Sequence, residues 1–398
     1  MIKNILKKVK FFVKINAFLK ALLYSFQTKN LESFYQQRAK SGRISYSQDE
    51  AVKLFRQTID HRLNKQNWIQ NSSKPNVYWI GTNWDQDNSG LLNGLKECSN
   101  LRMFFRPNGE YGFISNISQY GVENTIALNN REISEAVILE HQKQSIDIII
   151  GQMWANYISQ DVLAKFKEMG IIVINISMDD RLPEMWMMNK KTGTLGLKDG
   201  LDLVLTTAKE TCLWYRVEGI PAIYWPLASC PKVFGSINAR DIDISFIGNK
   251  YGYRGEIIEG LKASGIKIEA FGNGWDNGYV NAEEAANILS RSKMSLGIGT
   301  IGHTKSMLTL KLRDFDVPMS GALYITHRNK ELYDLFVEDE EILFYSSIDE
   351  LVQKVKLYLN HEDEMVRIAE NSRKRALKDH SWGQRFEFLL KIIKKQIK

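Results

Sequence analysis

From Val77 onward, short apolar runs alternate with longer helical stretches, and this alternation constrains the fold more than any other feature of the chain. Strands that alternate with helices are typical of an α/β layer built around a parallel sheet. A run of strand length that is apolar throughout also suits a strand buried on both faces. The strands expected in the first half of the chain are 77–80, 147–150, 171–176, 202–205 and 222–225.

A second series of strands begins at Asp243 and has its own turns and helices. Its expected members are 243–248, 266–272, 294–298, 322–325 and 342–344. At 398 residues the chain is too long for one ordinary core. We therefore expect an α/β protein with two Rossmann-like domains that face each other across a central cleft. The predicted divisions are a helical N-terminal extension (1–74), a first Rossmann-like domain (75–235), a second one (236–380) and a helix that crosses back to the first domain (381–398).

The first 28 residues contain lysines and no acidic residue. These lysines are Lys3, Lys7, Lys8, Lys10, Lys14 and Lys20. Four of them follow helical spacing and leave an apolar side, which is the pattern of a helix in an anionic membrane interface. A helix that packs its apolar side on the protein body gives the same pattern, and both alternatives stay open. Neither a membrane-spanning run of ~20 apolar residues nor a cleavable signal is recognisable, so we expect a cytoplasmic protein, peripheral on the inner face of the membrane in the first alternative.

The net charge of +7 comes from the N-terminal region, because residues 1–70 hold 14 basic and four acidic residues. The rest of the chain has slightly more acids than bases, so a nucleic-acid partner is not expected. The three cysteines, Cys98, Cys212 and Cys230, show no metal-binding spacing and are expected to be reduced thiols.

Several common ligand motifs are missing from the sequence. Neither GxGxxG after the first expected strand nor GxxxxGK[ST] occurs, which argues against a dehydrogenase or a nucleoside triphosphatase. The DxD pattern occurs three times, at 85–87, 241–243 and 314–316, but none of these pairs lies in an expected loop with a third acid nearby. We therefore expect neither a metal site nor a cofactor.

A charged helix followed by a buried strand is expected at 311–326, and it is the strongest candidate for a binding site. Its apolar side chains recur at helical spacing, which lets Lys311, Arg313 and Asp316 point into a cleft. Gly321 is expected to end the helix. Two cations and a carboxylate at the edge of a parallel sheet suit an anionic ligand that carries hydroxyls, such as a nucleotide diphosphate sugar. An amphipathic helix with solvated charges is the alternative.

Two other turns lie at expected strand ends. Asn83 ends the turn after the first strand, where ligands of open α/β sheets collect. Gly272 and Trp275 lie in a glycine turn whose N–H groups could approach a phosphate, although a surface turn would have the same composition.

Three titratable residues follow expected strands and are candidates for acid–base chemistry. Asp179 and Asp180 come directly after strand 171–176, so either carboxylate could accept a proton from a hydroxyl or hydrogen-bond a sugar. A helix cap would use the same residues. His303 lies in a glycine-containing loop, where a substrate contact and a structural role are both open.

The motifs of the second half, taken together, resemble those of the CgeB-like glycosyltransferases, a GT-B family related to the group 1 transferases. The similarity covers residues 243–390. Its segments are Ser245-Phe-Ile-Gly248 with Arg254, Phe271-Gly-Asn-Gly-Trp275, Lys311-Leu-Arg-Asp-Phe-Asp316 with Gly321 and Thr326, and His380-Ser-Trp with Arg385.

This resemblance implies a GT-B fold whose second domain binds the donor. Asp316 stands where the family has a glutamate that binds the ribose hydroxyls, and Lys311 and Arg313 would face the diphosphate. Fixed cations can stabilise the charge of a leaving nucleotide diphosphate without a metal. The group 1 transferases have a further acid eight residues earlier, where this chain has Leu308.

We therefore expect a metal-independent glycosyltransferase that moves a sugar from a UDP- or GDP-type donor to a hydroxyl of a glycan, lipid or protein. The expected donor-binding residues are Gly248, Arg254, Gly272, Trp275, Lys311, Arg313, Asp316 and Gly321. Asn83 is expected to bind the acceptor, and Asp179, Asp180 and His303 are the candidate catalytic residues. A nucleotide-sugar epimerase on the same fold and a non-catalytic nucleotide- or sugar-binding protein are the alternatives.

Overall fold

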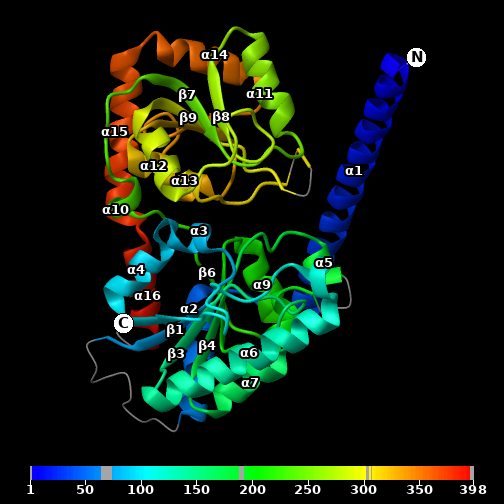
Figure 1. Cartoon of the computed structure of the whole chain (residues 1–398), viewed down its shortest axis with the longest axis vertical. Helices are drawn as coiled ribbons and strands as arrows, with labels where there is room; N and C mark the ends of the chain where they lie inside the picture. Colours follow the sequence, from blue (N-terminus) through cyan, green and yellow to red (C-terminus); the bar gives the residue numbers. More distant parts are fainter. Residues whose placement is uncertain (1, 64–73, 188–191, 302–303, 306, 395–398) are drawn as a thin grey trace. The chain divides into compact units, whose positions relative to one another are not determined.

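Two parallel β-sheets organise the computed structural model, which describes residues 2–63, 74–187, 192–301, 304–305 and 307–394 (Figure 1). The chain divides into two compact units. Unit 1 contains Met1–Glu32 and Leu227–His380, and unit 2 contains Ser33–Pro226 and Ser381–Lys398.

The sheet of unit 2 has six parallel strands in the order β2-β1-β3-β4-β5-β6. The strands are β1 (Asn76–Ile80), β2 (Asn100–Met103), β3 (Ile148–Gly151), β4 (Ile172–Ser177), β5 (Leu203–Thr206) and β6 (Ala222–Tyr224). The five strands expected from the sequence are confirmed, and β3, β4 and β5 are buried throughout. Strand β2 was not predicted, because this partly exposed edge strand contains polar residues and lacks a continuous apolar run.

Helices cover this sheet. They are α2 (Gln48–Arg62), α3 (Trp84–Gln86), the π-helical turn η1 (Asp87–Leu91), α4 (Leu92–Cys98), α5 (Ile117–Tyr120), α6 (Val122–Lys143), α7 (Gln160–Glu168), α8 (Glu184–Met187), the 3-10 turn η2 (Thr194–Gly200), α9 (Lys209–Val217) and α16 (Trp382–Ile393). Although α16 comes last, it packs against α4 within unit 2. Trp382 and Phe386 of α16 lie 5.5 and 5.3 Å from the Trp225 ring, measured between centroids.

The sheet of unit 1 has five parallel strands in the order β11-β10-β9-β7-β8. The strands are β7 (Ile242–Ile247), β8 (Ile268–Phe271), β9 (Ser292–Leu296), β10 (Leu323–His327) and β11 (Leu343–Tyr345). All five expected strands are confirmed. Strand β9 begins two residues before the expected 294–298 and ends two residues earlier, because Ser292 and Ser295 are buried partners of Ser245 in the sheet.

The helices of unit 1 pack around this sheet, with α11 against α14 and α12 against α13 (Figure 1). They are α10 (Pro231–Phe234), α11 (Arg254–Ala263), α12 (Ala282–Arg291), α13 (Arg313–Ser320), the 3-10 turn η3 (Leu332–Asp334), α14 (Ile348–Leu359) and α15 (Glu362–Asp379). The core between them is mainly aliphatic, with Phe246, Trp275 and Tyr345 as its aromatic members, and all five strands contribute to it together with α11, α14 and α15.

Helix α1 (Ile2–Gly42) is a single helix of 41 residues. Leu31, Tyr35 and Ala39 are buried in its second half, whereas Leu19 and Phe26 are more than half exposed. The side chains of residues 1–18, 20 and 21 lie outside the described part of the chain, so the membrane and packing alternatives for the N-terminal lysines stay predictions. No helix in the described part of the chain is long and apolar enough to cross a membrane.

Candidate functional site

Two glycine turns meet at the carboxyl edge of the unit 1 sheet. Gly248 follows β7 and Gly272 follows β8, with φ angles of 151° and 126°. A Cβ atom on Gly272 would lie 2.6 Å from the carbonyl oxygen of Gly248, so only glycine lets the two backbones approach this closely. The Gly248 N–H donates to the Phe271 carbonyl at 2.8 Å, which fixes one turn against the other.

Trp275 lies in the turn after β8 and supports the turn after β7. Its indole N–H donates to the Gly248 carbonyl at 2.7 Å, and its ring is nearly buried. The Lys250 ammonium lies 4.8 Å from the centre of the Trp275 ring, within range of a cation–π interaction. The structure therefore gives Trp275 a positioning role in the loop, and it places a cation beside the ring.

Two arginines converge on Gly248. A Cβ atom there would lie 2.7 Å from Nη1 of Arg313 and 3.3 Å from Nη1 of Arg254. Arg254, the first residue of α11, is buried and donates to the Asn249 carbonyl at 2.8 Å. Its guanidinium lies 4.0 Å from the centre of the Tyr251 ring. Two positive charges therefore lie beside the two glycine turns, an arrangement that suits a phosphate-bearing ligand.

Arg313 begins α13 and joins this helix to the strand ends. Its Nη1 and Nη2 atoms donate to the carbonyls of Ile247 and Ile298, each at 2.8 Å. The buried Nε–H has no hydrogen-bond acceptor among the described residues. The side chain thus holds the first turn of α13 at the carboxyl ends of β7 and β9 and keeps one donor unused.

Asp316 lies one turn further along α13 and is 8% exposed. Its Oδ1 accepts a hydrogen bond from the Ser229 hydroxyl at 2.7 Å, and Oδ2 has no partner among the described residues. Burial raises the pKa of Asp316 well above its ordinary value, against the opposing effects of Ser229 and the Arg313 charge. A ribose hydroxyl could therefore bond to Oδ2.

The other acid of this helix, Asp314, has its hydrogen-bonding capacity occupied within the fold. Its Oδ2 accepts from the Lys311 N–H at 2.6 Å, and the Tyr324 hydroxyl donates to Oδ1. Lys311 itself lies just before α13 and is partly buried. Asp314 therefore ties Lys311, the residue before the N-cap, to the first turn of α13, and both of its oxygens have partners within the fold.

Gly321 ends α13 as predicted, with the left-handed φ of 72° that favours glycine. It lies just before the amino end of β10, whereas Gly248 and Gly272 follow the carboxyl ends of β7 and β8, and the Arg313 side chain reaches the carboxyl ends of β7 and β9. Gly321 is therefore not brought together with the other expected donor residues. Its part in the fold is the turn from α13 into β10.

His327 and Ser229 also reach this region, and the sequence analysis missed both. Nδ1 of His327, the last residue of β10, lies 3.3 Å from the Tyr345 hydroxyl, which donates to the Gly297 carbonyl at 3.0 Å. Burial, with a smaller effect of the Arg313 charge, lowers the pKa of His327 to about 4. The position of His327 at the end of an expected strand could have identified it. Ser229 meets Asp316 only through the tertiary fold, 87 residues away along the chain.

His303 lies outside the described residues. The loop that contains it closes with hydrogen bonds from the Thr309 N–H to the Gly299 carbonyl at 3.1 Å and from the Tyr251 hydroxyl to the Thr300 carbonyl at 3.3 Å. These contacts hold the two ends of the loop near Tyr251, which contacts Arg254. The suggested catalytic role of His303 stays a prediction.

The remaining candidates belong to unit 2. Asn83 caps α3, because its Oδ1 accepts from the Gln86 N–H at 3.2 Å. Asp180 is buried beneath the end of β4 and accepts hydrogen bonds from the Ser177 and Thr206 hydroxyls. Burial raises the pKa of Asp180 to about 6. Asp179 has a φ of 57°, an uncommon conformation for a non-glycine residue that recurs at functional sites.

A second buried acid at this edge belongs to the first of the three DxD matches, at which the sequence predicted no metal site. Asp87 begins η1 and accepts from the Tyr111 hydroxyl at 2.7 Å and the Trp79 indole N–H at 3.2 Å. Burial raises the pKa of Asp87 to about 6. The described residues include no group of three or more acids, histidines or cysteines that could hold a metal ion.

Comparison with known proteins adds a partial family match. Residues 254–391 match a family model described as glycosyl transferase-like, which covers Arg254, Gly272, Arg313 and Asp316. A comparison of the sequence with curated proteins found no significant match.

Solved structures extend the similarity to both sheets. Sucrose-phosphate synthase from Thermosynechococcus elongatus superposes with a TM-score of 0.57 at 11% identity, over 81% of this chain and 99% of the synthase. Anabaena HepE in complex with UDP-glucose gives 0.56 at 8% identity, over 80% and 99% of the two chains. A glycosyltransferase from Rickettsia africae gives 0.52 at 10% identity, over 81% and 99%. At these identities the comparison establishes the fold, and it confirms the predicted GT-B class of two Rossmann-like sheets with N-terminal helices.

Proposed function

We propose that the chain is a glycosyltransferase that transfers a sugar from a UDP-sugar to a hydroxyl group, within the CgeB-like family that its motifs resemble. The observation that carries this proposal is the convergence of Arg254 and Arg313 on Gly248, beside the turn of Gly272. Three of these four residues lie in the segment that matches the glycosyl transferase-like model. A structural neighbour that was solved with UDP-glucose favours UDP as the nucleotide.

The donor would bind to unit 1, within its segment Leu227–His380. The diphosphate would lie against the two glycine turns, with Arg254, Arg313 and Lys311 as the cations that offset its charge. Asp316 would accept a hydrogen bond from a ribose hydroxyl through Oδ2, which Ser229 leaves unused. The indole of Trp275 would hold the Gly248 turn in shape.

In the transfer, the oxygen of the acceptor hydroxyl would attack the anomeric carbon as the bond between that carbon and the phosphate oxygen breaks. The bonding electron pair leaves with UDP, and the negative charge that develops is stabilised by the two guanidinium groups. This arrangement needs no metal ion. The acceptor's proton must pass to a base, for which Asp179, Asp180 and His303 are the candidates, with Asn83 as an acceptor contact.

The acceptor is a glycan, a lipid or a protein, and the N-terminal helix bears on this choice. If the lysine side of α1 binds an anionic membrane, the enzyme would be cytoplasmic and peripheral, and a lipid-linked acceptor would be favoured. Deletion of residues 1–20 should then release the protein from vesicles that contain anionic lipid. Unchanged vesicle binding would favour the packing alternative.

The direct test is turnover by the purified protein with a panel of UDP- and GDP-sugars. Arg313→Ala and Asp316→Ala should each lower turnover at least about 100-fold if they contact the donor. Arg291→Ala is the matched control, because Arg291 pairs with Asp241 on the exposed surface of the same unit. Loss of activity in the control as well would contradict the assignment.

Product analysis separates the alternatives. A transferase forms a new glycoside only when an acceptor is present, whereas an epimerase converts the donor without one. A binding protein would bind UDP, seen as a higher unfolding temperature, and would give no product with any donor.

A further inference from the structure

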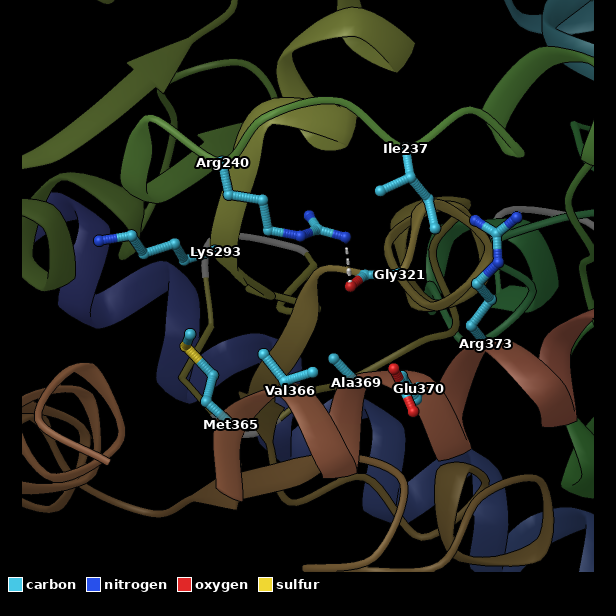
Figure 2. A pocket seen from close by; sticks show the side chains of 9 residues that line it. All are labelled: Ile237, Arg240, Lys293, Gly321, Met365, Val366, Ala369, Glu370 and Arg373. Atoms are coloured by element: carbon cyan, nitrogen blue, oxygen red, sulfur yellow. Dashed lines mark hydrogen bonds between the residues drawn. The ribbon is translucent and has the colours of Figure 1, made fainter. Parts of the chain in front are cut away.

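A small pocket lies at the amino edge of the unit 1 sheet, whereas the candidate donor site lies at the carboxyl edge. Arg240 precedes β7, Lys293 lies at the start of β9 and Gly321 precedes β10, so these residues gather at the amino ends of the strands. The volume of the cavity is about 150 Å³. Figure 2 shows that α15 forms one wall, from which Val366, Ala369 and the cation Arg373 line the space.

Two guanidinium groups of this pocket have neutral partners. Arg240 donates through Nη1 to the carbonyls of Ser290 at 3.5 Å and Ser292, and through Nη2 to those of Ser320 at 3.3 Å and Gly321 at 2.6 Å. Arg373 donates to the carbonyls of Met319 at 3.2 Å and Gly235 at 2.7 Å. Neither arginine forms an ion pair with a carboxylate in the described part of the chain. Burial and the nearby Arg373 charge both lower the pKa of Arg240, which indicates that the two cations repel each other.

The other charged residues of the lining do not neutralise this pair. The Lys293 ammonium points away from Arg240 and pairs with Asp243 at 2.9 Å (Figure 2). Glu370 is exposed on the α15 wall and pairs with neither arginine at ion-pair distance. The pocket therefore carries two uncompensated positive charges, and one carboxylate at its rim weakens their field.

We propose that this pocket binds a phosphate group, either free or carried by a small organic molecule. Guanidinium groups present parallel N–H donors that match the oxygens of a phosphate, and a dianion between Arg240 and Arg373 would remove their mutual repulsion. The apolar side chains of Val366 and Ala369 leave room for a short carbon chain next to that group. Both Nη groups of Arg240 already hold carbonyls at helix ends, so an anion would use its Nε–H together with the remaining N–H groups of Arg373.

The pocket is linked by contacts to helix α13. Arg240 and Arg373 hold the last carbonyls of this helix, at Met319 and Gly321, and the first turn of the same helix carries Arg313. Phosphate binding would therefore alter the affinity for UDP, and UDP would alter the affinity for phosphate by the same factor. This coupling rests on the proposed donor site, whereas phosphate binding itself does not.

The test is a titration of the full chain with inorganic phosphate and with ethyl phosphate, at constant ionic strength in chloride, followed by calorimetry. Arg373→Gln should weaken phosphate binding at least about tenfold, because it removes one of the two charged donors. Arg367→Gln is the matched control: Arg367 lies on the same helix, is exposed and pairs with Glu364. Its effect should stay within about twofold.

A second variant keeps the test decisive if Arg373→Gln does not fold. Glu370→Gln removes the exposed carboxylate at the rim and should strengthen phosphate binding by about two- to fivefold. Tighter binding of ethyl phosphate than of inorganic phosphate identifies an organic ligand, and equal affinities identify the free anion.

Binding at the donor site must be distinguished from binding here. Saturating UDP should still allow one phosphate to bind per chain, and a loss of all phosphate binding in saturating UDP would overturn the inference. No phosphate binding at millimolar concentration, or equal losses in Arg373→Gln and Arg367→Gln, would overturn it too. If phosphate binds as expected while UDP does not bind at all, this inference stands and the proposed function fails.

Discussion

At the scale of single residues, the fold gives similar side chains different tasks. Asp314 and Asp316 lie two residues apart on α13, both are buried, and both have a pKa that burial raises. Asp314 is held by Tyr324 and the Lys311 N–H, whereas Asp316 keeps Oδ2 without a partner in the described structure. The sequence alone shows two equivalent acids, because the contacts that separate them come from distant segments.

This difference can be measured with a matched pair of substitutions. Asp316→Asn should lower UDP affinity by about tenfold and change the free energy of unfolding little, because the amide keeps an oxygen for Ser229 and loses only the acceptor at Oδ2, which is used in the complex. Asp314→Asn should instead cost about 1–3 kcal/mol of stability, because it disturbs buried hydrogen bonds to Tyr324 and Lys311. Isothermal titration and urea unfolding provide the two measurements. The reverse pattern would assign the donor contact to Asp314.

His327 should make unit 1 sensitive to acid. Its pKa is about 4 in the folded state, below the ordinary 6.5, so the unfolded chain takes up a proton first as the pH falls. Stability should therefore decrease between pH 6.5 and 4, by at most about 3 kcal/mol, and be unaffected by this group above pH 7. His327→Gln should flatten this part of the pH profile of unfolding. An unchanged slope would show that the histidine already titrates normally in the folded protein.

At the scale of elements, the candidate donor site depends on close contact between the backbones of the turns after β7 and β8. Gly272→Ala would place a Cβ atom 2.6 Å from the Gly248 carbonyl, so the turns must separate. Gly278 also has a positive φ, of 71°, but a Cβ there meets nothing within 4 Å. Gly278→Ala is therefore a control that introduces the strain of a positive φ, about 1 kcal/mol, at another position of the same turn without the clash.

We expect Gly272→Ala to lower UDP affinity at least about tenfold and Gly278→Ala to lower it no more than about twofold, because only the first displaces the phosphate-facing backbone. Titration of both variants with UDP is the measurement. Equal affinities would mean that the turn after β8 does not bind the nucleotide.

The sequence predicted helices and strands better than it predicted contacts between residues. The buried strands were recognisable from continuous apolar runs, and Gly321 marked the end of α13, because both signals are local. Strand β2 has no such run and is held in place by pairing with β1. The partnership of Ser229 with Asp316 and the buried cluster around Asp87 depend on contacts between distant segments, which no local pattern predicts.

At the scale of the whole molecule, the chain enters unit 2 twice, since Ser33–Pro226 is completed by Ser381–Lys398. The second entry supplies a part of the core, where Phe386 is fully buried beside Trp225. A buried helix from the end of the described chain thus stabilises a sheet from its first half.

Phe386→Ala should therefore destabilise unit 2 by about 3–5 kcal/mol, because a large buried ring is removed from a packed core. Lys391→Ala, at an exposed position of the same helix, should have an effect below about 0.5 kcal/mol. Hydrogen exchange resolved by segment can locate the change, which we expect in β1–β6 and not in β7–β11. Equal loss of protection in both sheets would show that the two units unfold as one.

The divided composition of unit 2 also sets an order of events during synthesis. Its six strands leave the ribosome long before α16 does, and the whole of Leu227–His380 is translated in between. Until α16 has been translated, Trp225 and the surface of α4 lack the helix that covers them. The strands of unit 1 are synthesised during the same interval. A chaperone that shields apolar surface would be needed most in that interval, and slower translation of the segment before Trp382 would lengthen the exposure.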